Sequence, residues 1–448
     1  MSARRPGRFD VAMFNGGRGG AHIARRLLRT PGAGLTLLIN GYDNGLSTGA
    51  LRRYLPGMLG PSDFRKNLAL HLDAADPGQA ALLAVLEHRL PPGTTAGDLS
   101  RLVDALADSG RVPPERAGLA AFAGTEASTE VKASIGLEAS AGLEAFAALP
   151  RRARAAIAAD LAAFRHRLDQ DPGGLDLGDC ALGNLVFAGA HLRSGGDFNA
   201  AVRACARTFR TPARLLNVTS GENAYLAALK ENGRLLADEA DLVAPQDCSA
   251  VTDLFLLREP MTARDRAELE GRPAERIRRT LAGRAAAVSP NPEALAAIRE
   301  ADLIVYGPGT PHSSLCPSYL TPGVADAIET GRAAAKVFVV NLREDHDVQG
   351  LSAAGLVDLT LAYLGDPLNE RGTITHVLCH RDGTSRPGVP APPGLADGGT
   401  FAGARWIIAD LEDPERPGTH CGHRVTAILA RLAGHPAVPC EVALAAAG

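Results

Sequence analysis

The sequence predicts an α/β protein, built on a doubly wound, Rossmann-like parallel sheet that carries a mainly helical insertion. Three observations predict this fold class. Short, continuous apolar runs recur along the 448-residue chain, helical stretches lie between several of them, and residues 76–180 contain no clear strand. Continuous apolar strands suit a parallel sheet covered on both faces, and their alternation with helices is typical of a doubly wound fold.

The first strand, helix and second strand are expected within residues 9–39. "FDVAMFN" (9–15) is an apolar run that ends at the glycine cluster "GGRGG". "AHIARRLLR" then places Ile23, Leu27 and Leu28 at helical spacing, and Leu35 to Ile39 form the next apolar run. Later strands are expected at 213–218, 301–307, 336–341, 375–379 and 404–411, followed by a closing helix at 423–434.

The insertion is expected to span residues 76–180, within a core formed by residues 9–75 and 181–435. It is rich in alanine, and a section near 122–145 repeats "GLEA" and is expected to be mobile. Its clearest helix is "PRRARAAIAADLAAFRHRL" (150–168), which has one apolar face. That face comprises Ile157, Leu161, Phe164 and Leu168. The insertion is either a lid or partner surface, or a variable decoration.

Composition and charge argue against several classes of function. Lys and Arg number 47 against 50 Asp and Glu, a net charge of −3, so no polybasic field predicts a nucleic acid or membrane partner. No apolar run approaches the roughly 18–20 residues that span a bilayer, and the first ten residues do not resemble a signal peptide. Seven scattered cysteines argue against a disulfide framework. We therefore expect a cytoplasmic protein.

Histidines and cysteines near the C-terminus offer a zinc site as an alternative. "HCGH" (420–423) could combine with Cys379 and His380. No Cys-x-x-Cys pair supports this assignment, which favours a structural or surface role for these residues.

The loop after the first strand, "NGGRGGAH", is the first candidate phosphate site. Glycines let backbone N–H groups approach a phosphate, and the start of the following helix adds partial positive charge. The loop lacks the third glycine of the dinucleotide fingerprint, because Gly17 and Gly19 are followed by His22. This disfavours a dehydrogenase, and an ordinary tight turn remains the structural alternative.

A second candidate phosphate turn is "YGPGTPHSSLCPSYL" (306–320). A strand ends in Gly-Pro-Gly, and Ser313 and Ser314 lie close to the start of a helix. Two phosphate loops at one sheet edge suit a diphosphate or a nucleotide better than a monophosphate. The alternative is a turn with a serine at the helix N-terminus.

The segment "NGYDNGLSTGALRR" (40–53) brings a carboxylate, Asp43, together with hydroxyl donors and the cations Arg52 and Arg53. A second acid, Asp63, follows in "GPSDFRKNLAL". Two carboxylates near one sheet edge could bind one hard cation such as Mg²⁺ through oxygen ligands. The alternative is that Asp63 caps the helix from Phe64 onward, and that Arg65 is a solvated charge.

Five motifs occur in an order that resembles the 2-phospho-L-lactate transferase (CofD-like) superfamily. They are "NGGRGG", "NGYDNGLSTGALRR", "GPSDFRKNLAL", "LGNLVFAGAHLRSGGDF" and "GPGTPHSSLCP". The superfamily also includes the gluconeogenesis factors, which are nucleotide-sugar-binding regulators. "DNGLSTGALRR" and "PSDFRKNL" are similar to motifs of the regulator branch. The resemblance covers roughly residues 9–70 and 181–350 and leaves the insertion without a counterpart.

The resemblance implies particular roles for these residues. In the transferase branch, a hydroxyl of a deazaflavin precursor attacks a phosphate of a lactyl- or enolpyruvyl-diphospho-guanosine in a magnesium-dependent reaction that releases GMP. The resemblance to this branch implies that Asp43 and Asp63 are the catalytic residues and the metal ligands. The expected nucleotide- and phosphate-binding residues are Gly16, Gly17, Gly19, Gly20, Asn44, Ser47, Thr48, Arg52, Arg65, Asn67, Asn184, Gly307, Gly309, Ser313 and Ser314.

The chain departs from the family pattern at two places. Asn44 stands where a second acid is expected after Asp43, and "NLREDHDVQG" (341–350) replaces a Gln/Gly/Glu/Thr stretch of the regulator branch. Two functions stay open: an enzyme that transfers a phosphoester group from a nucleoside diphosphate conjugate, or a non-catalytic sensor of a UDP-sugar. The ligand is in both cases a nucleotide or nucleotide sugar, and the resemblance implies a homodimer.

Overall fold

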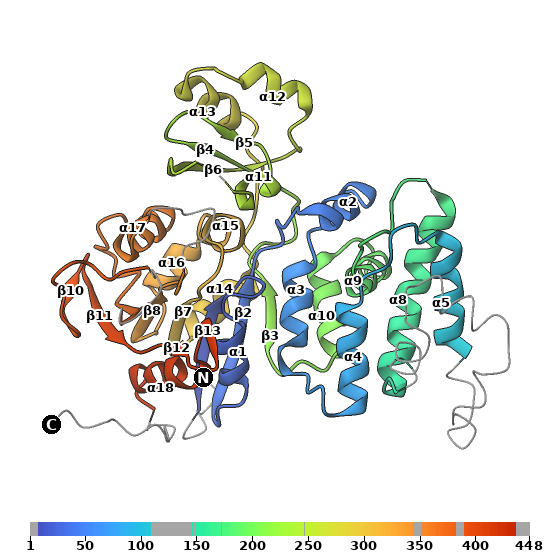
Figure 1. Cartoon of the computed structure of the whole chain (residues 1–448), viewed down its shortest axis with the longest axis horizontal. Coiled ribbons are helices and arrows are strands. Elements are labelled where there is room, and N and C mark those ends of the chain that lie inside the picture. The colour runs from blue at the N-terminus through green and yellow to red at the C-terminus, as the bar shows by residue number, and fades with distance from the viewer. Residues whose placement is uncertain are drawn as a thin grey trace. The chain divides into compact units, whose positions relative to one another are not determined.

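The computed structural model describes residues 8–108, 146, 148–171, 173–245, 247–343, 351–381 and 389–435. The chain divides into two compact units, which we call the sheet unit (Met1–Tyr42 and Pro212–Gly448) and the helical unit (Asp43–Thr211). Their elements are labelled in Figure 1. The section near 122–145, expected to be mobile, lies outside the described residues. Within the described ranges, no helix combines the length and apolar character needed to cross a membrane.

The sheet unit is built on an eight-stranded sheet, as the sequence predicts. Its strand order is β10-β11-β9-β8-β7-β1-β2-β3, with all neighbours parallel except the edge strand β10. All seven expected strands are present and confirm the predicted fold class. The strands are β1 (Phe9–Phe14), β2 (Ala33–Ile39), β3 (Arg214–Asn217), β7 (Leu303–Tyr306), β8 (Ala335–Val339), β9 (His376–His380), β10 (Thr400–Phe401) and β11 (Ala404–Ala409).

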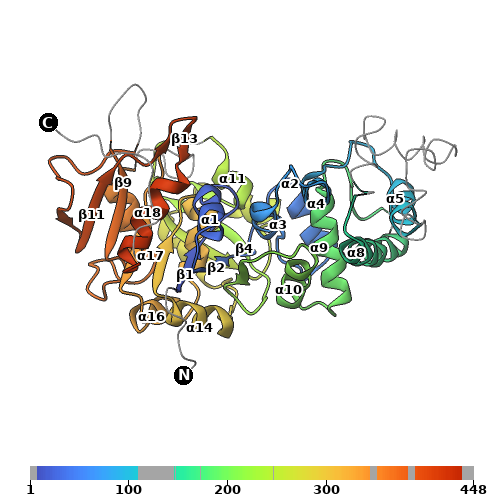
Figure 2. The ribbon, with the colours of Figure 1, turned by 90° about the horizontal axis from the view of Figure 1, so that it is seen from below.

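Helices cover both faces of this sheet. On one face lie α1 (Ala21–Leu28) and α18 (Gly422–Leu432), which pack against each other. The other face carries α14 (Pro292–Glu300), α15 (Cys316–Tyr319), α16 (Val324–Glu329) and α17 (Ala353–Tyr363), whose apolar side chains share one core with Phe14, Tyr306 and Trp406. Figure 2 shows α1 and α18 on one side of the strands and α14 and α16 on the other. Burial on both faces explains why the strands read as continuous apolar runs.

The strand order reverses between β1 and β7. From β1 the chain proceeds to β2 and β3 on one side, whereas β7 leads to β8 and β9 on the other. The loops that follow β1 and β7 therefore diverge at the carboxyl edge of adjacent strands. In open α/β sheets, ligands bind at such a topological switch point.

Residues 225–282 form a second, antiparallel sheet that the sequence analysis did not predict. Its strands are β4 (Tyr225–Lys230), β5 (Leu235–Leu236) and β6 (Val251–Leu257), and its helices are α11 (Glu239–Val243), α12 (Ala263–Leu269) and α13 (Ala274–Ala282). A separate hairpin joins β12 (Glu412–Asp413) to β13 (Arg416–His420). Strands β5 and β12 have two residues each, and β6 and β13 are partly exposed, so these segments lack the continuous apolar runs that identify the main sheet.

The helical unit contains the predicted helix at 150–168 as α8 (Arg151–Gln170), with the expected apolar face buried. The other elements are α2 (Leu46–Tyr54), α3 (Ser62–Leu68), η1 (Ala69–His71), α4 (Pro77–Glu87), α5 (Ala96–Asp108), α9 (Leu182–Arg193) and α10 (Phe198–Thr208). Helix α9 packs against α8 and α4. At Gly189 the two long helices meet so closely that a Cβ would lie 1.8 Å from the carbonyl oxygen of Asp160. Because of this packing, residues 43–75 and 181–211 join the predicted insertion in one compact unit.

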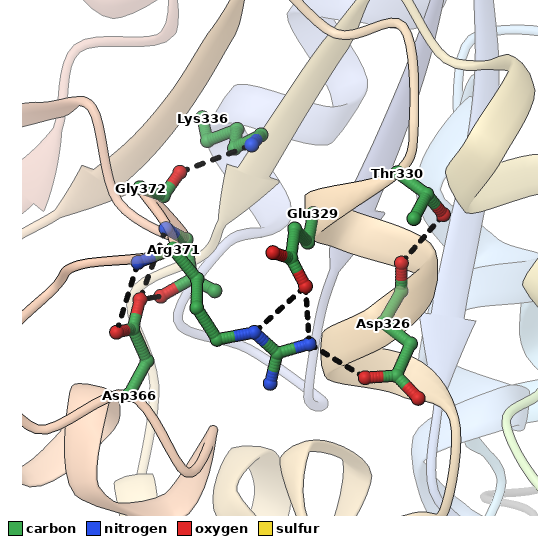
Figure 3. A network of polar contacts seen from close by, with 8 residues as sticks. Asp326, Glu329, Thr330, Lys336, Asp366, Arg371 and Gly372 are labelled. Atoms are coloured by element: carbon green, nitrogen blue, oxygen red, sulfur yellow. Dashed lines mark hydrogen bonds and ion pairs between the residues drawn. The ribbon is translucent and has the colours of Figure 1, made fainter.

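A polar network secures the turn that leads into β9 at the opposite, amino edge of the sheet. Arg371 forms ion pairs with Asp326 and Glu329, and the Asp366 carboxylate accepts hydrogen bonds from the backbone of the same turn (Figure 3). The Lys336 ammonium donates a hydrogen bond to the carbonyl oxygen of Gly372 (3.0 Å). Arg371 is paired with two acids, and Lys336 and Asp366 bond the backbone of the turn, so the network explains the position of a turn and not a binding site.

Candidate functional site

The two predicted glycine loops lie in direct contact at the topological switch point. A Cβ at Gly19 would lie 2.3 Å from the carbonyl oxygen of Pro308 and 2.6 Å from the Cα of Gly309. A Cβ at Gly307 would lie 2.6 Å from the carbonyl oxygen of Phe14. These distances are too short for any side chain, so glycine is required for the two loops to meet. The sequence predicted two loops at one edge, and the fold brings them together.

The first loop leaves a run of backbone donors available. Within the described residues, no hydrogen bond engages the N–H groups of Gly17, Arg18 or Gly19. Gly17 is buried, and buried amides are almost always paired. The loop leads directly into α1, whose N-terminus at Gly20 has no side-chain cap. Successive unpaired N–H groups before a helix N-terminus form an anion-binding backbone.

Asparagines at the ends of parallel strands hold these loops, and the sequence analysis missed them. Asn341 follows β8 and bonds Gly309 twice: its Oδ1 accepts from the backbone N–H (3.1 Å) and its Nδ2 donates to the carbonyl oxygen (2.9 Å). Asn40 follows β2 and donates to the carbonyl oxygen of Ser314. Asn15 follows β1, and its Oδ1 lies 2.0 Å from where a Cβ of Gly20 would be. The sequence did contain a signal for them, because each of these asparagines directly follows an apolar run.

The predicted serines lie in η3 (Pro311–Leu315), a π-helical turn. Ser313 is buried and Ser314 is partly exposed. Neither hydroxyl is a cap for this turn, since no side-chain hydrogen bond is present at its N-terminus. The alternative of a serine at a helix N-terminus is therefore wrong for this segment.

The β12–β13 hairpin is fixed to the same carboxyl edge. The ring Nε2 of buried His420 lies 3.1 Å from the carbonyl oxygen of Val340, so this nitrogen carries the proton and donates. Burial lowers the pKa of His420 to about 4, which keeps the ring neutral near pH 7. Burial also lowers the pKa of His22, in the first turn of α1; the charges of Arg416 and Arg25 add to this effect, and the charge of Asp413 opposes it.

In the helical unit, Asp43 begins the segment that leads into α2. Its Oδ1 accepts a hydrogen bond from the backbone N–H of Gly45 (3.0 Å), and among the described residues it forms no ion pair. Gly60 packs against it, because a Cβ at Gly60 would lie 2.3 Å from the carbonyl oxygen of Asp43. The loop before α3 therefore lies against the loop that carries Asp43.

Arg52, a predicted ligand contact, has its side chain fully buried. Its Nη1 donates to the carbonyl oxygen of Asp43 (3.1 Å) and to Oδ1 of Asn44 (3.4 Å). The guanidinium thus holds the loop that carries Asp43. The neighbouring Arg53 is exposed, and Ser47 is partly exposed within α2.

A buried polar network links α2, α3, α4 and α9. The hydroxyl groups of Thr48 and Ser62 lie 2.6 Å apart, and Asn184 Nδ2 donates to Ser62 (3.3 Å). Arg65 donates to Asn184 Oδ1 (3.0 Å) and to the carbonyl oxygen of Leu86 (2.7 Å). The alternative that Arg65 is a solvated charge is wrong, since it is only 7% exposed. In this network, Thr48, Arg65 and Asn184 fasten helices to one another.

Asp63 is buried in the first turn of α3, where Pro61 occupies the N-cap position and no side chain caps the helix. The predicted capping role for Asp63 is therefore wrong. Its carboxylate pairs with the Lys66 ammonium (2.9 Å), and its carbonyl oxygen accepts from Asn67 Nδ2 (2.8 Å). Lys66 is a cation that the sequence analysis left out of the site.

The donors fit a magnesium ion in kind. Mg²⁺ is usually held by one or two carboxylates together with substrate phosphates and water. Asp43 and Asp63 supply two carboxylates on loops that pack together, although Lys66 already neutralises part of the Asp63 charge. Across the described ranges, no group of three or more His, Cys, Asp and Glu side chains is arranged to hold a metal ion. This includes the histidines and cysteines near the C-terminus.

The predicted site residues thus form two groups. The glycines, Ser313 and Ser314 belong to the sheet unit and gather around the switch point. The remaining predicted residues belong to the helical unit: Asp43, Asn44, Ser47, Thr48, Arg52, Asp63, Arg65, Asn67 and Asn184.

Over residues 11–389 the sequence matches the family described as "2-phospho-L-lactate transferase CofD". The chain belongs to the CofD family. This confirms the resemblance drawn from the five motifs.

Curated relatives of this CofD family member are gluconeogenesis factors. The chain is 27% identical to that of Bacillus subtilis over 179 residues, which are 40% of this chain and 45% of the relative. It is 25% identical to that of Halalkalibacterium halodurans over 218 residues, 48% of this chain and 55% of the relative. A putative gluconeogenesis factor of Thermotoga maritima is 30% identical over 162 residues, 36% of this chain and 41% of the relative. The chain spans about half the length of the curated relatives it matches.

A similar solved structure is a Bacillus halodurans protein of the UPF0052 family. The TM-score is 0.57 at 19% sequence identity, and the match covers 94% of this chain and 99% of that one. A second crystal structure of the same protein gives the same TM-score at 20% identity. At this identity the likeness establishes the fold alone. The α/β fold of this chain is therefore shared with a solved structure.

Proposed function

We propose that this protein binds a nucleoside diphosphate conjugate, with the diphosphate held by the loops that follow β1 and β7. The observation that carries the proposal is the run of unpaired backbone N–H groups at Gly17, Arg18 and Gly19, placed at the switch point of the sheet. The second glycine loop lies in contact with the first at the same edge of the sheet. Membership of the CofD family supports the same class of ligand.

Binding is tested by thermal shift and calorimetry of the full chain with GDP, UDP, UDP-N-acetylglucosamine and GMP, each with and without magnesium. A ligand that binds only the folded protein adds RT ln(1 + [L]/Kd), about 2.7 kcal/mol at a hundredfold excess over Kd. We expect the diphosphates to stabilise the protein more than GMP. Equal, negligible shifts with all of them would contradict the proposal.

Our first candidate activity is transfer of a phosphoester group of the 2-phospho-L-lactate transferase type, with release of GMP. Asp43 and Asp63 would hold Mg²⁺, which when bound neutralises charge on the phosphate oxygens. Asp43 is available for this role because it has no ion pair among the described residues. Arg52 keeps the Asp43 loop in place, and Lys66 holds one oxygen of Asp63.

Asp63→Asn tests this candidate. We expect it to lower turnover of a guanosine diphosphate conjugate, measured as GMP release, while nucleotide affinity falls only modestly. Lys66→Ala is the matched variant, since it frees the carboxylate without removing it. Unchanged turnover in Asp63→Asn would exclude the catalytic role of this residue.

The second candidate is a non-catalytic regulator that binds a UDP-sugar. It is favoured by the names of the curated relatives and by the ion pair that engages Asp63. A shift with UDP-N-acetylglucosamine that does not depend on magnesium, together with no GMP release, supports this candidate over the transferase.

A further inference from the structure

Arg343 lies at the carboxyl edge of the sheet, in the segment where the sequence departs from the family pattern. It follows Asn341, the side chain that holds Gly309 of the second glycine loop, by two residues. Its side chain is exposed, and within the described residues it forms no hydrogen bond and no ion pair. A guanidinium has five N–H donors, so here its full capacity to bind an anion is available.

This guanidinium is nonetheless held in one place by the β12–β13 hairpin. A Cβ at Gly418 would lie 2.0 Å from Cζ of Arg343, 2.1 Å from Nε and 2.2 Å from Nη2. Three nearly equal distances place the guanidinium plane across the glycine. Gly418 also has a φ of +88°, which disfavours any other residue. Glycine at 418 therefore gives Arg343 its resting position.

The hairpin is in turn attached to both sides of the glycine loops. His420 donates to the carbonyl oxygen of Val340 at the end of β8. At the other side β13 contacts α1, and Gly422, the first residue of α18 just after the hairpin, also packs on α1, where its Cβ would lie 2.4 Å from the carbonyl oxygen of His22. Because α1 begins directly after the first loop, the hairpin connects the β8 end to the start of α1. Arg343 consequently belongs to the same edge as the two loops.

We propose that Arg343 binds an oxyanion, a phosphate or a carboxylate, of the ligand whose diphosphate the glycine loops hold. The proposal rests on the proposed function and adds a specificity-determining residue to it. The planar fork of a guanidinium matches two oxygens of a phosphate or carboxylate at once. Because Gly418 already orders the side chain, less conformational entropy is lost when the ligand binds.

The test compares Arg343→Ala, Arg343→Lys, Gly418→Ala and the double variant with the unaltered protein. Affinities for inorganic pyrophosphate, GDP and phosphoenolpyruvate are measured by calorimetry in the presence of magnesium. We expect Arg343→Ala to weaken binding about tenfold to a hundredfold, and Arg343→Lys less, since lysine keeps the charge and loses the fork. Gly418→Ala should weaken binding because it displaces Arg343, and it should have no further effect in Arg343→Ala.

Arg416→Ala is the matched control. It removes the same charge from β13, the strand on which the Arg343 guanidinium rests, but Arg416 is already paired with Asp413 (3.0 Å), so affinity should stay close to that of the unaltered protein. Loss of affinity for pyrophosphate and GDP assigns Arg343 to a phosphate, and loss confined to phosphoenolpyruvate assigns it to a carboxylate. Circular dichroism verifies that each variant is folded.

Three results would overturn the inference, and they are distinguishable. If the unaltered protein binds none of the three probes and no nucleoside diphosphate, the proposed function fails and the role of Arg343 with it. If the unaltered protein binds them and Arg343→Ala binds as well as Arg416→Ala, only the role of Arg343 fails. Additive effects of Arg343→Ala and Gly418→Ala would likewise contradict an action of Gly418 through Arg343.

Discussion

The two groups of predicted binding residues use different chemistry. In the sheet unit, the loops at the switch point consist of glycine backbone held by neutral asparagines, and among the described residues the N–H groups of Gly17, Arg18 and Gly19 have no hydrogen-bond partner. In the helical unit, the predicted arginines are buried and donate to carbonyl and amide oxygens of the protein. A glycine in a motif thus identifies a place where two backbone segments approach closely, whereas a charged residue in a motif can be part of the structural framework.

Arg65→Ala is expected to have the largest effect, and it acts on stability. The change leaves the carbonyl oxygen of Leu86 and the amide oxygen of Asn184 without their buried donor. We expect a loss of about 3 kcal/mol in the free energy of unfolding, measured by urea denaturation. Arg53→Ala, at the exposed penultimate residue of α2, should stay within about 0.5 kcal/mol. If both variants lose equally little free energy of unfolding, Arg65 is not part of the framework of the helical unit.

The corresponding buried titratable group of the sheet unit is His420. Its folded-state pKa of about 4 lies below the ordinary 6.5, so the unfolded chain binds more protons between these values. The contribution of His420 to stability is therefore complete above about pH 6.5 and is lost as the pH falls towards 4, up to on the order of 3 kcal/mol.

His420→Gln tests this pH dependence, because a glutamine amide can donate to Val340 without titrating. The free energy of unfolding, measured by urea denaturation, should change less between about pH 7 and about pH 5 in the variant than in the unaltered protein. If the change is the same in both proteins, the pKa of His420 does not differ between the folded and unfolded states.

Gly19→Ala is expected to act on binding. Its Cβ would collide with the second glycine loop, at 2.3 Å from the carbonyl oxygen of Pro308, and would separate the two loops. We expect at least about a tenfold loss of affinity for GDP, or roughly 1.4 kcal/mol. Gly309→Ala is the matched control, since the nearest atom to its Cβ would be 3.7 Å away. If both variants bind GDP equally well, contact between the loops is not what forms the site.

The smallest effect is expected from Asn341→Ala, which removes two hydrogen bonds to Gly309 without creating a collision. We expect a loss of about 1 kcal/mol in stability and a few-fold weaker affinity for GDP. Asn341→Asp keeps the acceptor for the Gly309 N–H, loses the donor to its carbonyl oxygen and adds a negative charge. It should therefore bind GDP more weakly than Asn341→Ala, and the reverse order would contradict the positioning role of Asn341.

The main sheet was predictable because its central strands are buried on both faces, so "FDVAMF" and "KVFVV" read as continuous apolar runs. The antiparallel sheet at 225–257 was not predicted, since β5 has only two residues and β6 is partly exposed. The site divides in the same way. Glycine loops are visible in sequence, but an asparagine such as Asn341 becomes meaningful only when the loop that it holds is known.

By itself, the sequence determined the α/β class, seven of the eight strands of the main sheet, the two glycine loops and membership of the family. These depend on local patterns, such as apolar runs and glycine clusters, which act over a few residues. Only the tertiary structure decided that Gly19 touches Pro308, that Arg52 and Arg65 are buried, and that Arg343 rests on Gly418. Those facts depend on residues far apart in the chain, and burial of a charge follows from its distant hydrogen-bond partners rather than from its neighbours in sequence.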